Sequence, residues 1–267
     1  MAKAEASVEE LVAMIARGEL RLPEMQRRYV WRASRVRDLL DSLYRGYPSG
    51  TILLWETDED VPLQEFSVRQ QDNAYQTTRL LLDGQQRLTS LSAVIRGEPV
   101  KVKGRKRPVE ILFNLEHPDE LAFVTEVEEA AIELDGELSD DEVDSSEDEL
   151  QRRFDKLAFV VSTRKLAAQP HWVRVTDVFK SDSDAEFLKS AGVTSFDDPR
   201  YEKYAKRLAR LRSIRKYVYR MDILERSMSY NEVTEIFVRV NSLGAKLRSS
   251  DLALAQITAK WRGSLET

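Results

Sequence analysis

Residues 80–88 read Leu-Leu-Leu-Asp-Gly-Gln-Gln-Arg-Leu. The three leucines form a short apolar run that ends at Asp83-Gly84, and apolar residues then recur at helical spacing at Leu88, Leu91 and Ile95. This pattern predicts a buried strand, a tight turn and an amphipathic helix in direct succession. The candidate chemistry lies at the junction of that strand and that helix.

The first turn of the predicted helix contains Gln85, Gln86 and Arg87. Free backbone N–H groups and the positive end of the helix dipole make a helix N-terminus suited to anions. Gly84 lets a ligand approach the backbone closely, and Arg87 can donate several hydrogen bonds to phosphate oxygens. We therefore interpret the junction as a phosphate-binding, nucleotide-binding element. The alternative is structural: Asp83 caps the helix, Gly84 makes the turn and both glutamines lie on the surface.

The composition excludes several kinds of site. The 267-residue chain has no cysteine and two histidines. This excludes disulfides, cysteine nucleophiles and thiolate zinc sites, and leaves little for a histidine metal cluster. A divalent ion would be a hard one, such as Mg²⁺, held by carboxylates and phosphate oxygens. Because the sequence contains no apolar run of membrane-spanning length and no secretory signal, we expect a cytoplasmic protein without a membrane partner.

The formal charge of −5 is unevenly distributed along the chain. Between Arg107 and Arg152 there are 17 acidic residues and no Lys or Arg, which leaves 41 bases against 29 acids elsewhere. A basic body with one acidic insert suits an anionic ligand, either a nucleotide or a nucleic acid. The alternative is that many of these bases form solvated helix faces, as in residues 201–215.

Hydrophobic periodicity and capping signals predict an alternation of strands and helices. We expect strands at 20–22, 51–55, 80–82, 109–113, 159–161, 172–175 and 217–223. We expect helices at 84–96 and 199–215, and after caps at Ser7, Ser34, Thr176, Ser229 and Ser249 or Ser250. The Thr176 helix should extend toward residue 189 and the Ser229 helix to about residue 241.

These elements indicate an α+β fold, with strands mainly in the first two-thirds of the chain and a helical C-terminal part. We expect residues 1–125 to form a nucleotide-binding core and the acidic residues 126–150 to form a mobile or exposed insertion. Residues 151–267 should supply the remaining strands and the helical part of the same domain. The last predicted helix continues toward the end of the sequence, which is compatible with a longer protein.

A second segment, Gln26-Arg27-Arg28-Tyr29-Val30-Trp31, has no clear periodicity and precedes a helix. Its arginines can contact phosphate, and its aromatic side chains can stack on a base. The alternative is that Tyr29, Val30 and Trp31 anchor the loop in the core and the arginines are solvated. We favour anchoring for Trp31 and a ligand contact for Gln26 and Arg27.

A third segment, residues 237–247, contains Arg239, Asn241 and Lys246. Asn241 tolerates the left-handed conformation that helix ends require, and Gly244 relaxes the loop that follows. These three polar side chains can converge on one ligand. The alternative is an ordinary helix C-cap and a loop into the next helix.

In order, the three segments resemble the N-terminal domain of the GmrSD-type modification-dependent restriction endonucleases. That family's pattern is a proline before Gln-Arg-x-x-x-Trp, then Asp-Gly-Gln-Gln-Arg after an apolar strand, then Phe-x-Arg-x-Asn-x-x-Gly far downstream. The matching residues here are Pro23 with Gln26–Trp31, then Asp83–Arg87, then Phe237–Gly244. The resemblance spans about residues 8–260.

The resemblance implies a ParB/sulfiredoxin-like small mixed sheet with flanking helices, in which a Gly-x-x-Arg turn, here Gly84 to Arg87, contacts nucleotide phosphates. It also implies nucleoside triphosphate binding and hydrolysis with a divalent cation, in a prokaryotic system that restricts modified phage DNA. Longer relatives cut DNA with a C-terminal HNH-type nuclease domain. Its His-Asn-His pattern is missing here, so we expect the nuclease to be a domain or subunit outside this chain, and a homo-oligomer remains open.

Under this hypothesis, Asp83 binds the metal or orients water, Gln85 or Gln86 positions the attacking water, and Arg87 neutralises phosphate charge. The rest of the nucleotide site would comprise Gln26, Arg27, Gly84, Arg239, Asn241 and Lys246. We expect Arg87→Ala to abolish hydrolysis and to leave the fold intact.

Two other functions remain open. A sensor that binds DNA or nucleotide without turnover would use Arg27, Arg28 and residues 101–107 along a phosphate backbone. Direct DNA nicking would need carboxylates around a metal, for which Asp83 and Asp251 are the candidates.

Overall fold

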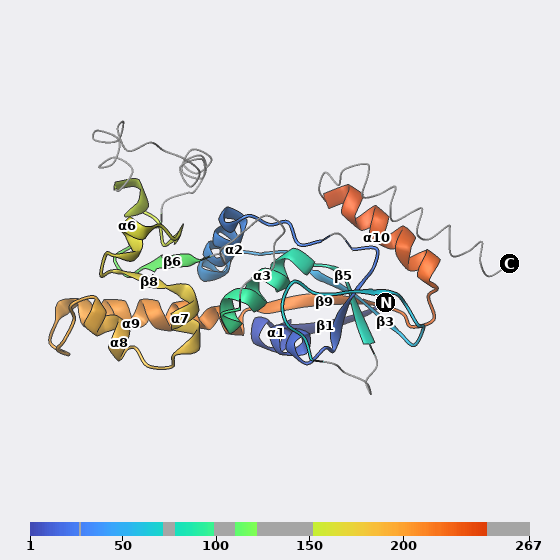
Figure 1. Cartoon of the computed structure of the whole chain (residues 1–267), viewed down its shortest axis with the longest axis horizontal. Coiled ribbons are helices and arrows are strands. Elements are labelled where there is room, and N and C mark those ends of the chain that lie inside the picture. The colour runs from blue at the N-terminus through green and yellow to red at the C-terminus, as the bar shows by residue number, and fades with distance from the viewer. Residues whose placement is uncertain (27, 72–77, 99–109, 122–151, 245–267) are drawn as a thin grey trace.

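A computed structural model of the protein describes residues 1–26, 28–71, 78–98, 110–121 and 152–244 (Figure 1). The strands are β1 (Ala2–Ser7), β2 (Leu20–Pro23), β3 (Ile52–Thr57), β4 (Leu63–Gln64), β5 (Thr78–Asp83), β6 (Ile111–Asn114), β7 (Phe159–Val161), β8 (Trp172–Arg174) and β9 (Val218–Leu224). The helices are α1 (Val8–Ala16), α2 (Ala33–Arg45), α3 (Gln85–Arg96), α6 (Arg164–Ala167), α7 (Val175–Lys180), α8 (Ala185–Ser190), α9 (Pro199–Arg212), the 3₁₀ helix η1 (Ser213–Lys216) and α10 (Tyr230–Gly244).

The larger sheet is mixed, with strand order β1-β9-β3-β5-β2-β4. Its parallel pairs are β3 with β9 and β2 with β5, and its other neighbours are antiparallel. This arrangement confirms the α+β class with a mixed sheet and flanking helices. The relation to the ParB/sulfiredoxin fold stays a prediction.

Alternate side chains of the central strands pack against helices on opposite faces of this sheet. Leu81 of β5 belongs to the main core with residues of α1, α2 and α3, whereas Leu80 and Leu82 belong to a second cluster with Val233 and Phe237 of α10. A strand that is buried on both faces reads as a continuous apolar run, which explains the three leucines. β5 therefore lies between these two layers and ends at Asp83, directly before Gly84.

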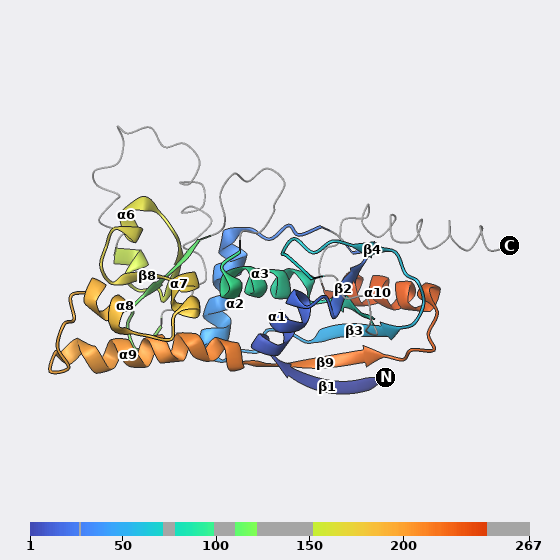
Figure 2. The same ribbon diagram turned by 60° about the horizontal axis from the view of Figure 1, so that its bottom comes forward.

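The smaller sheet, of order β7-β6-β8, lies beside the larger one together with α6, α7, α8 and α9 (Figures 1 and 2). Its strand β6 precedes residues 126–150, and its strands β7 and β8 follow them. The acidic insertion predicted at 126–150 lies outside the described residues. The chain returns from α9 through η1 directly into β9, so one continuous segment connects both sheets.

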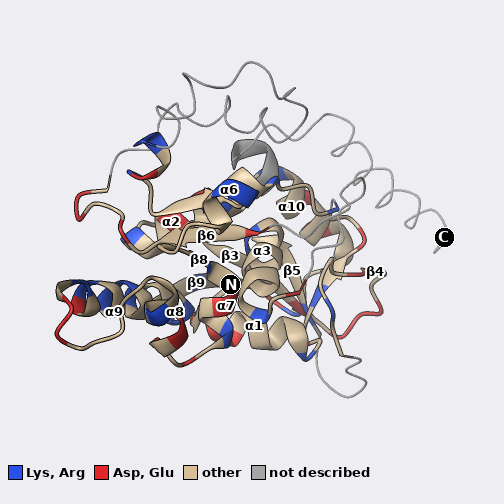
Figure 3. Cartoon of the chain, turned by 60° about the vertical axis from the view of Figure 1, so that its left-hand side comes forward, with Lys and Arg blue, Asp and Glu red and all other residues tan. Residues whose placement is uncertain are grey.

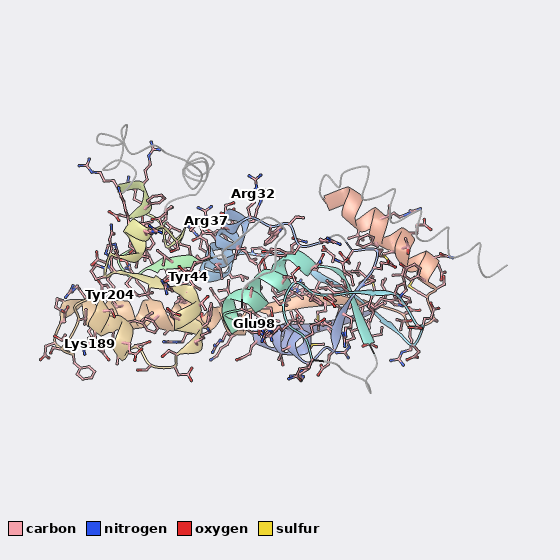
Figure 4. All side chains as sticks on the ribbon, viewed as in Figure 1. Arg32, Arg37, Tyr44, Glu98, Lys189 and Tyr204 are labelled. Carbon is pink, nitrogen blue, oxygen red and sulfur yellow. The ribbon has the colours of Figure 1, made fainter. Side chains whose placement is uncertain are left out.

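A polar cluster, which we call the α2–α9 contact, fastens the smaller sheet to both helices. The Oη of Tyr44 on α2 lies 3.0 Å from His117 Nε2, and His117 Nδ1 lies 2.7 Å from the Pro118 carbonyl oxygen. Because a carbonyl only accepts, Nδ1 donates and Nε2 accepts from Tyr44. The guanidinium of Arg210 on α9 lies 4.4 Å from the centre of the Tyr44 ring. Figure 4 shows Tyr44 on α2 and Tyr204 on α9.

Two sequence predictions, for the helix from Thr176 and for the start of α2, were wrong. The single helix expected from Thr176 toward residue 189 is divided into α7 and α8, because Ser181 and Ser183 hydrogen-bond to each other locally and so compete with the helix. Ser34 does not cap α2, since the N-cap position is Arg32 and has no side-chain hydrogen bond. The strand predicted at 217–223 is confirmed as β9, which lies inside the larger sheet.

Candidate functional site

The candidate site is centred on the elbow, defined as residues 83–87 between β5 and α3. Gly84 is the N-cap of α3 and has φ of 101°, a conformation that favours glycine. A Cβ at this position would overlap Cδ1 of buried Ile52 on the neighbouring strand. No side chain caps α3, so Asp83 does not act as the cap that the structural alternative required. The first N–H groups of α3 are therefore left without a capping side chain.

Arg87 is fixed by the turn that precedes β3. Its Nη1 donates to the Ser49 carbonyl, and its Nη2 donates to the Thr51 carbonyl at 2.6 Å and to Asp83 Oδ2 at 3.2 Å. The guanidinium carbon lies 5.7 Å from the centre of the Tyr219 ring. A Cβ on Gly50, between both acceptor residues, would overlap Arg87 Nη1. Arg87 is thus held in one position, with 14% of its side chain exposed.

This arrangement changes the expectation for Arg87→Ala. Removing the guanidinium would leave the carbonyls of Ser49 and Thr51 without the partners they have in the structure. Hydrogen bonds to charged groups contribute about 1.5–3 kcal/mol each. The prediction that Arg87→Ala leaves the fold intact therefore has to be replaced by one in which the variant also loses stability.

The glutamines of the elbow are buried and do not lie on the surface. Gln86 Oε1 accepts from the backbone N–H of Val30 at 2.9 Å and of Trp31 at 3.2 Å, and its Nε2 donates to the Arg28 carbonyl at 3.3 Å. These three hydrogen bonds of the Gln86 amide hold the second segment. Within the described residues, the side chain of Gln85 accepts one hydrogen bond, from Gln86 Nε2 at 3.4 Å.

Gln26 connects the second segment to the end of β5. Its Nε2 donates to the carbonyls of Leu81 at 3.0 Å and Leu82 at 2.5 Å, directly before the elbow. Tyr29 is buried, with its Oη 2.8 Å from Ser90 Oγ of α3, and Trp31 packs partly buried against the main core. Anchoring of the aromatic residues is confirmed. Arg27 lies outside the described residues.

The arginines around these anchors point to solvent. Arg28, Arg32 and Arg35 are exposed, and within the described part of the chain none of them has an ion-pair partner. Figure 4 shows Arg32 projecting from the start of α2 away from the body. We call residues 28–35 the basic segment, because no acidic residue occurs between Glu24 and Asp38.

The third predicted segment lies on α10. Phe237 is buried in the cluster that contains Met25 and Leu82, so this helix packs behind the elbow. Arg239 pairs with Glu235 one turn earlier at 2.5 Å, and both side chains are exposed. Asn241 lies within α10, which continues to Gly244, so the expected helix end at Asn241 was wrong. Lys246 and Asp251 lie outside the described residues.

The structure adds residues that the sequence did not single out. Ser49 and Thr51 supply the carbonyls that hold Arg87, and Tyr219 Oη accepts from Ser49 Oγ at 2.8 Å. Burial raises the pKa of Tyr219 above its usual value, against the opposing effects of Ser49 and Arg87. The sequence signal for these contacts was the turn at Tyr47-Pro48-Ser49-Gly50. It predicted a chain reversal but no contact with Arg87.

The described residues limit a metal site. Among them, no group of three or more His, Asp or Glu side chains is placed to hold a metal ion. Asp83 offers one carboxylate with 40% of its side chain exposed. Within the same ranges, no helix has the length and apolar character needed to cross a membrane.

A comparison with known families identifies the family of this chain. Residues 8–258 match the model of the GmrSD restriction endonuclease, N-terminal domain. The chain belongs to this family. The three sequence segments, residues 26–31, 83–87 and 237–247, lie inside the matched GmrSD N-terminal region. The chain is therefore a component of a restriction system.

A relative of this GmrSD N-terminal domain is the uncharacterized protein MJ0686 of Methanocaldococcus jannaschii. It is 34% identical over 113 residues, which is 40% of this chain. The match spans 20% of that protein's length.

Proposed function

We propose that this chain binds a nucleoside triphosphate at the elbow and hydrolyses it, and that this turnover regulates cleavage of modified DNA. The nuclease would be a domain or subunit outside this sequence, and the system would act in the cytoplasm. The observation that supports the proposal is the fixed guanidinium of Arg87 beside an uncapped helix N-terminus. A polyphosphate is bound well by an immobile cation next to free amide donors.

The contacts suggest a division of roles within the elbow. The backbone N–H groups of Gln85, Gln86 and Arg87 would donate to phosphate oxygens. The Arg87 side chain would offset the charge that develops on the transferring group. The Gln86 amide is occupied by backbone partners, so Gln85 is the glutamine left to position the attacking water. Gln26 would act by fixing the end of β5.

A divalent cation fits this donor set as a companion of the nucleotide. Mg²⁺ is usually held by one or two carboxylates together with substrate phosphates. Asp83 would supply that carboxylate, and the cation would neutralise phosphate charge. Because Asp83 lies 3.2 Å from Arg87, it would first have to exchange this partner.

The test is phosphate release from the four common triphosphates, with and without modified DNA. We expect Arg87→Ala to lower turnover by about 10²–10³-fold. Gln85→Ala should lower turnover and keep nucleotide binding. Turnover by Arg87→Ala at the wild-type rate would contradict the proposal.

Arg212→Ala is the matched control, since Arg212 is buried to a similar degree and has similar partners away from the elbow. It donates to the carbonyls of Val178 at 3.3 Å and Ser181 at 3.0 Å and pairs with Asp184 at 2.5 Å. This variant should lose stability and keep its turnover at a temperature where it is folded. Equal loss of turnover in both variants would show that Arg87 acts only through the fold.

A second candidate is a sensor that binds DNA without hydrolysis. The observation that favours it is the basic segment, whose exposed arginines Arg28, Arg32 and Arg35 have no described ion-pair partner. Binding by phosphate contacts should weaken with salt, with a logarithmic slope of about −0.9 per contact. Steep salt dependence without any phosphate release would favour this function over the first.

A further inference from the structure

Among the residues that the structure describes, β1 forms one border of the larger sheet, and no strand pairs with its outer side. The strand pairs with β9 on one side only, and Figure 2 shows no labelled element beyond it. It is six residues long, without proline and without a register shift against β9. Such an edge presents unpaired backbone groups that can pair with another strand. The opposite border, β4, has only two residues.

The hydrogen-bonding phase of β1 is set by its pairing with β9. Just past the strand, Val8 N–H donates to the Tyr217 carbonyl at 2.9 Å. Groups facing one neighbour alternate along a strand, so Ala4 and Ala6 also face β9, and Lys3 and Glu5 direct their N–H and C=O groups outward. Ser7 N–H also points away from β9, where it bonds Glu10 Oε2 at 2.7 Å.

We propose that two copies of this chain associate by antiparallel pairing of their β1 strands, with Lys3 of one copy opposite Glu5 of the other. In this register the two-fold axis passes between both Ala4 residues, and each Lys3–Glu5 pair exchanges two backbone hydrogen bonds. Opposite charges directly across a strand pair are favourable. Shifting the register in either direction would place Lys3 opposite Lys3 or Glu5 opposite Glu5.

The neighbouring strand extends this complementarity. In β9, Arg220 lies opposite Glu5, with their charged atoms 3.9 Å apart, and Asp222 lies opposite Lys3. Across the four strands the charges would alternate as Arg220, Glu5, then Lys3 and Asp222 of the second copy. The other face of β1 carries alanines, which leave room for the elements that cover it. Pairing consumes the open edge, so association stops at two copies.

Charge variants test the register in the whole chain carrying no N-terminal tag. We expect the wild type to show a concentration-dependent dimer by sedimentation velocity. Lys3→Glu and Glu5→Lys should each raise the dissociation constant at least about tenfold, because like charges then face each other. An equimolar mixture of both variants should form a heterodimer, since both cross-strand pairs regain opposite charges. Circular dichroism checks that each variant keeps the fold.

A disulfide provides the second measurement, since the chain has no cysteine of its own. Ala4→Cys would place both sulfurs beside the two-fold axis, where facing Cα atoms lie about 4.5 Å apart. We expect this variant to form a crosslinked dimer under mild oxidation and Ala2→Cys, four residues out of register, to stay uncrosslinked. A wild type that is monomeric up to its solubility limit, or a dimer unaffected by both charge variants, would overturn the proposal.

Discussion

The elbow and the α2–α9 contact are both built from polar side chains held between packed elements, but they differ in access. At the elbow, Arg87 is braced by two carbonyls beside a helix end that has no capping side chain. At the α2–α9 contact, His117 is 3% exposed and both of its ring nitrogens have protein partners. A closed polar cluster can only stabilise the fold, whereas one that keeps free donors at a helix end can also bind a ligand.

The elbow and the α2–α9 contact also differ in how their arginines are paired. The charged residues of α9 are mainly Lys and Arg (Figure 3), and some of them have partners inside the molecule. Arg207 donates to the Leu115 carbonyl at 2.6 Å and pairs with Asp119 at 2.8 Å. By contrast, the arginines of the basic segment remain exposed beside the elbow. Sequence charge alone does not distinguish a structural arginine from one that is available to a phosphate.

The largest effects on stability and ligand binding are expected when Arg87 or Arg212, which both donate to backbone carbonyls, is replaced by alanine. Arg87→Ala removes two charge-assisted hydrogen bonds to carbonyls, so we expect a loss of about 4 kcal/mol in the free energy of unfolding by urea titration. Arg212→Ala should lose a comparable amount. A triphosphate that binds the folded state should raise the melting temperature of the wild type and of Arg212→Ala, but not of Arg87→Ala. Equal ligand shifts in all three proteins would remove Arg87 from the site.

The second largest effect is expected at low pH, where the α2–α9 contact should lose stability. Burial lowers the pKa of His117 from 6.5 to about 4, with further lowering by Arg207 and Arg210 against the raising effects of the Pro118 hydrogen bond and Asp119. The unfolded chain takes up the proton first as the pH falls below 6.5. The contribution of neutral His117 to the free energy of unfolding should therefore be complete above pH 6.5. It should decrease by about 3 kcal/mol as the pH falls toward 4.

The control for this pH dependence is His117→Gln. It removes the titrating ring, so its unfolding free energy should change less than that of the wild type over the same pH interval. Both profiles are measured by urea titration at a fixed ionic strength. Parallel profiles would assign the acid sensitivity to other groups.

The sequence predicted the local elements of the elbow but not its contacts. The apolar run and the helical repeat located β5 and α3 because both depend on neighbours in the chain. The bond from Arg87 to Thr51 spans 36 residues and the bond from Gln86 to Val30 spans 56, so no local pattern encodes them. β1 was missed because Ala, Lys and Glu have low strand propensity, and only pairing with β9 makes the segment extended.

Gln86→Ala should have an intermediate effect on the free energy of unfolding, and it tests whether the elbow holds the basic segment. The variant leaves the N–H groups of Val30 and Trp31 without their acceptor, for which we expect a loss of about 2 kcal/mol. Because the amide holds the basic segment, DNA affinity should also fall more than nucleotide affinity. Thr89→Ala serves as the control. Thr89 is fully buried one turn along the same helix, and replacing it keeps the Gln86 contacts with the basic segment. A variant with unchanged DNA affinity would show that the segment keeps its shape without Gln86.

The smallest effect is expected where an ion pair lies on an open helix face. Lys206 and Glu202 of α9 approach to 2.5 Å, but their side chains are 75% and 77% exposed. Solvent screening and the entropy of ordering two long side chains offset most of this attraction. Lys206→Ala should therefore leave the urea midpoint unchanged within error at pH 7 and in high salt. A clear loss of stability would mean that α9 also depends on its surface charges, and that burial is not what separates structural from solvated arginines and lysines in this helix.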